Sequence, residues 1–253
     1  MAELTFISYN ITESNYLFKI ILDYLSSQSD TILFLQEIKP DFKIDKTHNV
    51  VKILGQKKKS DLRVFATKNL QQFCIKCDTY DRYQILRTKN GNFVNVHMPS
   101  AWRTEDPAYL KYTEIAKKIR EKNDFDLIGG DLNSNPFEKM TVSPIAWFAK
   151  RSLDDFTQNR DEGLLNPFWS VFNIGMSGNA KGSFPGDTHK FSKRQIIDQF
   201  FVSPLKWQNV IDCGIMEDLS GENFNTINNK PEVKSSKGHG ELHFPVYIKY
   251  KIG

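Results

Sequence analysis

Short apolar runs of strand length recur along the whole chain, and polar or turn-forming residues separate them. The runs are Leu4–Ser8, Ile32–Leu35, Leu62–Ala66, Phe93–Val96, Leu127-Ile128, Phe200–Val202 and Val246–Ile248. Such runs, bounded by turn signals and rich in β-branched and aromatic residues, are typical of strands buried in a sheet. The pattern therefore predicts a sheet-rich protein.

Two segments between these runs have the three-to-four-residue apolar spacing of an amphipathic helix. Their apolar positions are Leu17, Ile20, Ile21, Tyr24 and Leu25 in the first, and Tyr112, Ile115, Ala116 and Ile119 in the second. Asp106 is predicted as the N-cap of the second helix, and Pro107 suits its first position. Strands mixed with a few helices and joined by short connections predict an α/β sandwich, in which helices cover the sheets.

Composition and charge are those of an ordinary globular protein. The 253 residues are 40% hydrophobic and 25% charged, with a mean hydropathy of −0.47. No repeat, low-complexity tract or long linker divides them, so residues 1–253 are predicted to form a single domain. The net charge of +4 is too small to indicate nucleic-acid binding by itself, although Lys57–Lys59, Lys117-Lys118 and Lys190–Arg194 are local basic clusters.

The start of the chain and the cysteine count bear on its compartment. Met1–Phe6 has no basic stretch followed by a long apolar one, unlike a secretory signal. Three cysteines cannot all pair, which favours a reducing compartment, and we interpret Cys74 and Cys77 as reduced thiols on opposite sides of a strand. Polar residues interrupt the uncharged segment 163–180 too often for a membrane helix. We therefore expect a cytoplasmic protein that does not span a membrane.

Polar residues gather where the apolar runs begin and end. Asn10, Gln36-Glu37, His97 and Asp131 with Asn133 follow four of the runs, whereas Asp198 and His243 precede the last two. If a strand that ends and its neighbour that begins run antiparallel, these residues lie on the same rim of the sheet. The pattern therefore predicts that these positions converge on one site.

Carboxylates, amides and imidazoles together suit the hydrolysis of a phosphoester. Glu37 is the leading candidate for a Mg²⁺ ligand, because this ion prefers a few oxygen ligands together with water and phosphate oxygens. Asp131 can orient or deprotonate an attacking water, and the Asn133 amide can donate to a phosphate oxygen. Asp198 would fix the tautomer of His243 and stabilise its protonated form.

Six motifs in fixed order resemble the endonuclease/exonuclease/phosphatase superfamily, which has the DNase I-like fold. The motifs are Ile7-Ser8-Tyr9-Asn10, Phe34-Leu35-Gln36-Glu37, Asn95-Val96-His97-Met98-Pro99, Gly130-Asp131-Leu132-Asn133-Ser134-Asn135-Pro136, Ile197-Asp198-Gln199-Phe200-Phe201-Val202-Ser203 and His243-Phe244-Pro245-Val246. Together they span nearly the whole chain. The resemblance implies a four-layered α/β sandwich, with two packed mixed β-sheets flanked by helices and a divalent-metal phosphoesterase site at one rim.

The resemblance also implies roles at the matching positions. Glu37 resembles the metal-binding glutamate, with Asn10 as its polar partner at the metal site. Asp131 resembles the aspartate that activates or orients the nucleophile, and Asn133 the asparagine that contacts phosphate. Asp198 and His243 resemble the paired catalytic aspartate and histidine.

Three further positions bear on substrate. His97, which we count with the catalytic residues, resembles the histidine of the DNase I, sphingomyelinase, inositol phosphatase and deadenylase branches, and this disfavours an abasic-site repair enzyme. Arg82 falls near the phosphate-contacting arginine of many members. Trp102 follows the His97 motif closely enough to stack on a base at the rim of the site.

One departure from the family pattern affects the expected metal site. The family usually has Ser-Asp-His before its final Pro-Val motif, whereas this chain has Glu241-Leu242-His243. Leu242 has no ligand atom, so Glu241 is the substitute candidate, although adjacent residues of an extended segment point to opposite sides.

The sequence as a whole predicts a phosphodiesterase that depends on Mg²⁺ or Mn²⁺. The favoured activity is that of a nuclease, which hydrolyses DNA or RNA by metal-assisted attack of water, so that nucleic acid is the expected partner. One alternative is a phosphatase or phosphodiesterase for a small molecule or phospholipid headgroup. The other is a catalytically impaired protein that binds nucleic acid or a protein, because Leu242 replaces the usual aspartate.

Overall fold

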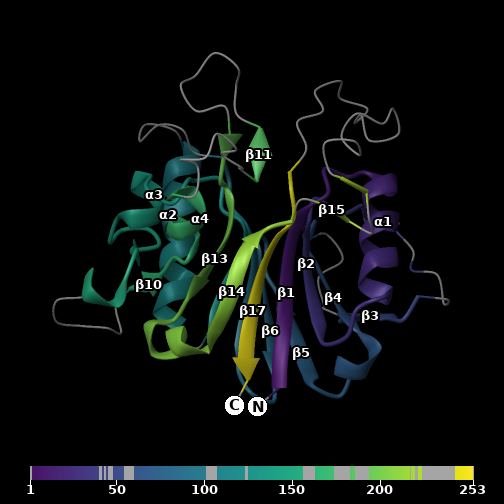
Figure 1. Cartoon of the computed structure of the whole chain (residues 1–253). Helices are drawn as coiled ribbons and strands as arrows, with labels where there is room; N and C mark the ends of the chain where they lie inside the picture. The colour runs from purple at the N-terminus through teal and green to yellow at the C-terminus, as the bar shows by residue number, and fades with distance from the viewer. Residues whose placement is uncertain are drawn as a thin grey trace.

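Two mixed sheets pack face to face, and helices cover their outer faces (Figure 1). The computed structural model describes residues 2–39, 42, 44, 48–53, 60–100, 107–122, 125–155, 163–173, 183–185, 194–216, 218–219, 222–223 and 243–252. The arrangement is the α/β sandwich that the sequence predicts, in the four layers that the resemblance implies.

The first sheet has six strands and contains both ends of the chain. Its order is β14 (Val210–Ile215), β17 (Val246–Ile252), β1 (Ala2–Asn10), β2 (Thr31–Gln36), β4 (Arg63–Thr67) and β3 (Val50–Ile53). Strand β1 runs parallel to β2 and antiparallel to β17, so the two termini lie side by side (Figure 1). The last strand of the chain therefore begins where the first one ends.

The second sheet has seven strands, and two short ribbons accompany the sheets. The sheet order is β5 (Cys74–Thr79), β6 (Tyr83–Thr88), β7 (Asn92–His97), β8 (Leu127–Asp131), β13 (Asp198–Val202), β10 (Leu164–Leu165) and β9 (Ala149–Lys150). The ribbons pair β11 (Phe184–Pro185) with β12 (Arg194–Gln195), and β15 (Asp218–Leu219) with β16 (Glu222–Asn223). Strand β8 is parallel to β7 and antiparallel to β13.

Both predicted helices are confirmed. They are α1 (Asn15–Ser26) and α2 (Pro107–Lys122), and the shorter helices are α3 (Lys139–Val142), α4 (Phe168–Asn173) and the 3-10 turns Lys68–Leu70, Leu153–Asp155 and Pro204–Asn209. The Ser14 hydroxyl accepts a hydrogen bond from the Leu17 amide and caps α1, because the first amides of a helix have no partner within it. The predicted N-cap Asp106 lies outside the described residues.

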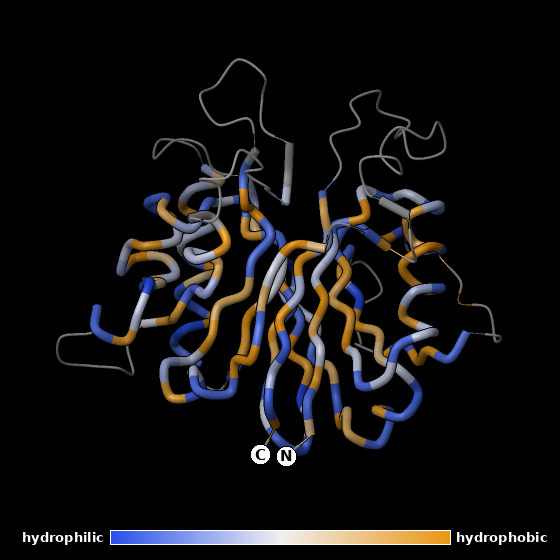
Figure 2. The backbone as a smooth tube through the Cα atoms, viewed as in Figure 1, coloured by the Kyte–Doolittle hydropathy of each residue, from blue (hydrophilic) through white to orange (hydrophobic). Residues whose placement is uncertain are grey.

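The hydrophobic core has three parts, which follow from the alternation of side chains along the strands. Between the sheets, Phe6 and Phe34 of the first sheet meet Phe93 and Phe200 of the second, and the Phe6 and Phe93 ring centroids are 4.5 Å apart. The other faces of the two sheets pack against α1 and α2 respectively. Apolar segments alternate with more polar ones along the strands in Figure 2. No helix in the described part of the chain is both long and apolar enough to cross a membrane.

Among the strands of four residues or more, the apolar pattern missed β3, β5, β6 and β14. Three of these strands form sheet edges, where exposed positions break up the apolar run, and Gln84 interrupts β6. The expectation that Cys74 and Cys77 point to opposite sides was wrong. A register shift between Cys74 and Lys76 inserts a bulge, and both thiols pack against the core between the sheets.

We expect Gly130→Ala to destabilise the fold. A Cβ at this position would lie 2.0 Å from the Val96 carbonyl oxygen on the neighbouring strand, and the backbone φ of +156° also disfavours a side chain. The free energy of unfolding in urea should fall by about 2 kcal/mol or more. Gly214→Ala is the control, because its Cβ would approach only the Tyr247 ring at 3.0 Å, and it should cost less than about 1 kcal/mol. Equal losses would contradict this prediction.

Candidate active site

The predicted polar positions converge at one rim of the sandwich. In the strand registers, Asn10 pairs with Gln36, and Asp131 pairs with His97 on one side and Asp198 on the other. Parallel neighbours end at the same edge of a sheet, and an antiparallel neighbour begins there. His243 comes three residues before β17 and reaches this rim as well. Both sheets therefore contribute side chains to one site.

The buried carboxylate of Asp131 lies at the centre of this site. Its Oδ2 accepts a hydrogen bond of 3.0 Å from Asn10 Nδ2, and its Oδ1 accepts one of 2.9 Å from the Asn133 backbone amide. Asn10 Nδ2 is also 3.2 Å from Glu37 Oε1, whereas Asn10 Oδ1 accepts from the Thr12 amide. One amide group thus connects a carboxylate of the first sheet with a carboxylate of the second.

Two residues of the site have a left-handed backbone that side chains other than glycine seldom adopt. Glu37 has a φ of 51° and Asn133 a φ of 48°. At Glu37, the adjoining chain is held by hydrogen bonds from the Glu13 amide to the Glu37 carbonyl and from the Ile38 amide to the Asp61 carbonyl. Such strain persists only where the surroundings impose it, and it is concentrated at functional sites.

His243 and Asp198 form a buried pair, as the sequence predicts. His243 Nδ1 is 2.8 Å from Asp198 Oδ2, and His243 Nε2 faces Asp131 Oδ2 at 4.0 Å. Burial lowers the pKa of His243, but the negative charge of Asp198 and its hydrogen bond outweigh this effect and raise the pKa above its usual value. Burial raises the pKa of Asp198. The pair therefore keeps a proton that Nε2 can present to the cavity.

His97 forms a second pair of this kind with Asp61, a residue that the sequence analysis missed. His97 Nδ1 is 2.8 Å from Asp61 Oδ2, while Nε2 lies 3.7 Å from Glu37 Oε1 and 3.9 Å from Asp131 Oδ2. Burial opposes both charged forms, but the shared hydrogen bond and the nearby opposite charges raise the pKa of His97 and lower that of Asp61. Asp61 comes just before β4, so its position at the start of a strand was an available signal, as for Asp198.

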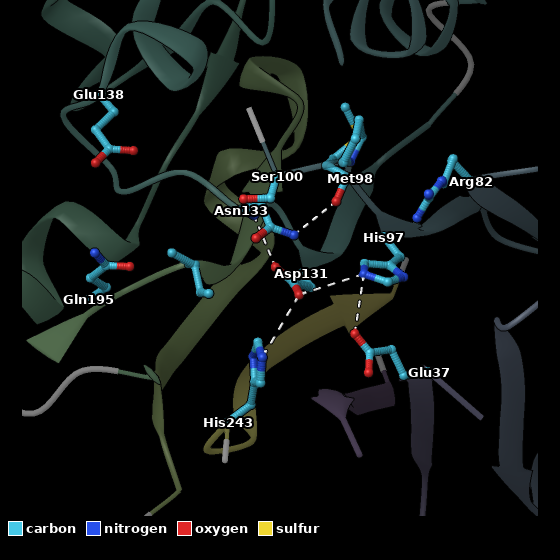
Figure 3. Close-up of a pocket in the computed structure, with 12 residues that line it drawn as sticks. Glu37, Arg82, His97, Met98, Ser100, Asp131, Asn133, Glu138, Gln195 and His243 are labelled. Atoms are coloured by element: carbon cyan, nitrogen blue, oxygen red, sulfur yellow. Dashed lines mark hydrogen bonds and ion pairs between the residues drawn. The ribbon is translucent and has the colours of Figure 1, made fainter. Parts of the chain in front are cut away.

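The side chains of Glu37, His97, Asp131 and His243 line a cavity of about 470 Å³ (Figure 3). Its lining residues are Glu37, Arg82, His97, Met98, Pro99, Ser100, Asp131, Asn133, Glu138, Gln195, Ile197 and His243. Asn10 and Asp198 do not line the cavity but are buried behind it. Glu138 and Gln195, which the sequence analysis did not select, lie on the other side of the cavity from Arg82 (Figure 3). No motif distinguished these two residues from ordinary polar residues of a loop and a short strand.

The remaining predicted positions divide into two groups. Asn133 and Arg82 reach the cavity, and Asn133 Nδ2 donates a hydrogen bond of 2.8 Å to the Met98 carbonyl, which leaves its second hydrogen available. Glu241 and Trp102 lie outside the described residues, as does Leu242.

The donor set fits a divalent metal ion. Asp131, Asp198 and His243 each offer a ligand atom, and these atoms lie within 4.8 Å of one another, so this group could hold an ion. Because Asp198 and His243 already bind each other, Glu37 together with Asp131 forms the more open pair of oxygen donors facing the cavity. Carboxylate oxygens beside a water-accessible space are the ligands that Mg²⁺ and Mn²⁺ prefer.

Solved structures of similar fold include an AP endonuclease from Archaeoglobus fulgidus, with a TM-score of 0.58 and 13% identity, covering 98% of this chain and 100% of that one. The chain has the DNase I-like fold. The 3′-5′ exonuclease NExo from Neisseria meningitidis has the same TM-score at 14% identity, with 98% and 100% covered. The 3′ phosphatase NExo from Neisseria bound to product DNA hairpin scores 0.54 at 14% identity, with 98% and 99% covered.

At the level of sequence, the chain matches no protein-family model and no curated protein. Identities of 13–14% show the DNase I-like fold alone. The use of His97 to disfavour an abasic-site enzyme therefore stays a prediction.

We expect Asp61→Asn to reduce stability in a pH-dependent way in metal-free buffer. The raised pKa of His97 contributes stability that is complete below its unfolded value, near 6.5, and that disappears as pH rises through the folded value. The lowered pKa of Asp61 contributes stability above its unfolded value, near 3.8, that disappears as pH falls. The loss should therefore be greatest between these values, at about 1 kcal/mol, because the Asp61 side chain is 38% exposed.

Chemical denaturation at several pH values measures this effect. Asp81→Asn is the control, because Asp81 is 76% exposed and pairs only with Lys111 among the described residues. A loss for Asp61→Asn that does not change between pH 4 and 9 would contradict the expected coupling.

Proposed function

We propose that this protein is a divalent-metal-dependent phosphodiesterase, and specifically a nuclease that hydrolyses DNA or RNA. One observation carries the proposal. The Nε2 atoms of His97 and His243 both face Asp131 Oδ2 at 3.9 and 4.0 Å, in a cavity that Glu37, Asn133 and Arg82 also line. These separations are longer than a hydrogen bond, so the three groups are arranged around a shared space rather than bonded to one another.

The residues suit the attack of water on phosphorus. The Asp131 carboxylate retains lone pairs that can accept a proton from water, whose oxygen then bonds to phosphorus as the P–O ester bond breaks. His243 and Asn133 can donate to the non-bridging oxygens, and Arg82 can hold a neighbouring phosphate. A Mg²⁺ or Mn²⁺ ion at Glu37 and Asp131 would neutralise charge on the phosphate and the leaving oxygen. Direct attack implies inversion at phosphorus.

Two further considerations support nucleic acid as the substrate. One solved structure of similar fold is a 3′ phosphatase bound to product DNA hairpin. The site is open at the rim of the sandwich, with a basic residue, Arg82, at one side of the cavity. The cytoplasmic location belongs to this proposal as well.

We expect Asp131→Asn and His243→Gln each to lower cleavage of single- or double-stranded oligonucleotides by about 10²–10⁴-fold. Asn keeps the shape of the Asp131 side chain but removes the proton acceptor, and Gln keeps a polar side chain at position 243 but removes the charged donor. Asp78→Asn is the control, because Asp78 of β5 pairs with Lys76 of the same strand and Arg87 of β6, outside the cavity lining. Full activity in both site variants would show that the assigned roles are wrong.

The metal requirement has a separate test. Glu37→Gln should raise the Mg²⁺ or Mn²⁺ concentration that gives half-maximal activity by about tenfold or more, because a neutral amide is a weaker ligand than a carboxylate. Leu242→Asp restores the residue usual in the family and should lower that concentration if the position faces the ion. An unchanged requirement in Glu37→Gln would remove Glu37 from the metal site.

A substrate panel with and without chelator separates the alternatives. Cleavage of a small phosphodiester or phospholipid headgroup, but of no oligonucleotide, would favour the small-molecule enzyme. Salt-sensitive binding of nucleic acid without cleavage under any metal would favour a binding protein.

A further inference from the structure

The two halves of the site belong to different sheets, so their separation depends on how the sheets pack. Glu37 and Asp61 adjoin β2 and β4 of the first sheet, whereas His97 and Asp131 end β7 and β8 of the second. Most of the contact between the sheets is apolar, as in the Phe6–Phe93 pair. Apolar contacts are non-directional and do not by themselves fix how far one sheet slides over the other.

A buried polar bridge crosses this apolar layer close to the site. Asn95 of β7 accepts a hydrogen bond of 2.7 Å at Oδ1 from Gln36 Nε2 of β2. Its Nδ2 lies 3.3 Å from the Leu35 carbonyl oxygen and 3.2 Å from the Arg63 carbonyl oxygen. Asn95 and Gln36 are both fully buried. One side chain of the second sheet is therefore hydrogen-bonded to two strands of the first.

Every contact of the bridge is within two residues of a site residue. Gln36 precedes Glu37 directly, Asn95 is two positions before His97, and Arg63 is two positions after Asp61. The strands that carry these residues are hydrogen-bonded to their neighbours, β2 to β4 and β6 to β7. A shift at the bridge therefore changes the separation of His97 from both Glu37 and Asp61.

We propose that Asn95, together with Gln36, is a positioning pair that fixes the alignment of the two sheets and hence the geometry of the active site. The proposal rests on the proposed function for its kinetic consequence. Burying two amides in an apolar layer costs the free energy of their hydration. Hydrogen bonds to each other and to the backbone offset much of this cost. What the pair adds is direction, since a hydrogen bond fixes distance and angle where apolar packing does not.

The kinetic test compares two substitutions on the same strand. Asn95→Leu removes the bridge, whereas Phe93→Leu loosens the same apolar layer two residues farther from the site. We expect Asn95→Leu to lower kcat for an oligonucleotide about 10–100-fold with KM changed less than about threefold, because a displacement of about 1 Å costs on the order of 10²-fold in rate. Phe93→Leu should keep kcat within about threefold of the wild-type value, even if it lowers Tm as much as Asn95→Leu does.

A double variant covers the case in which the single one does not fold. Asn95→Leu leaves the Gln36 amide buried without this partner, so Asn95→Leu with Gln36→Leu removes both amides and should recover part of the lost Tm but not kcat. The recovery is partial because the buried Ser8 hydroxyl also pairs with Gln36 and loses its partner. Recovery of kcat together with Tm in the double variant would overturn the positioning role. Unfolding of both variants would also overturn it, because the bridge would then be a requirement of folding.

A spectroscopic test does not depend on catalysis. The Nδ1 proton of His97, which is donated to Asp61, should give a downfield NMR signal that is assigned by its absence in His97→Gln. Asn95→Leu, or the double variant, should shift or abolish this signal, and Phe93→Leu should leave it in place. An unchanged signal would overturn the proposal even if the wild-type protein cleaves nucleic acid. A changed signal in a protein that cleaves no phosphoester would support the alignment and reject the proposed function instead.

Discussion

The position of one carboxylate, that of Asp131, is the constraint on which the site depends. It is 2% exposed and is held by Asn10 of the first sheet and by the backbone of Asn133 beyond the second. Two imidazoles face the same oxygen, and each is held from behind by an aspartate, Asp198 or Asp61. Hydrogen bonds that are formed in advance require no reorganisation when charge develops, which is the property a phosphoryl-transfer site needs.

This placement is possible because two sheets present their strand ends at the same rim. Parallel neighbours, β1 with β2 and β7 with β8, end there, and the antiparallel strands β13 and β17 begin there. The left-handed backbone at Glu37 and Asn133 then turns their side chains out of the regular strand pattern. The bridge between Asn95 and Gln36 adds direction to the largely apolar contact between the sheets. Each level of the structure thus restricts the geometry of the next.

The sequence predicted the sandwich and the convergence of strand ends, because burial imposes apolar runs and because polar residues at their ends are conspicuous. Asp61 stands just before the start of a strand, which is local information, but its pairing with His97 of the second sheet is a long-range contact that no local pattern encodes. The bulge that places Cys74 and Cys77 on one face depends equally on its partner strand. Glu138 and Gln195 reach the cavity only through tertiary packing. Strand ends are local information, whereas pairings across strands are not.

The central claim is that side chains from both sheets surround a single hydrated cation and the phosphate beside it. An anomalous-difference map from a crystal of the protein soaked with Mn²⁺ tests this most directly. The account predicts one strong peak in the cavity, in direct contact with a Glu37 carboxylate oxygen and on the side that faces Asp131. A peak bound elsewhere, with Glu37 and Asp131 remote from it, would contradict the account.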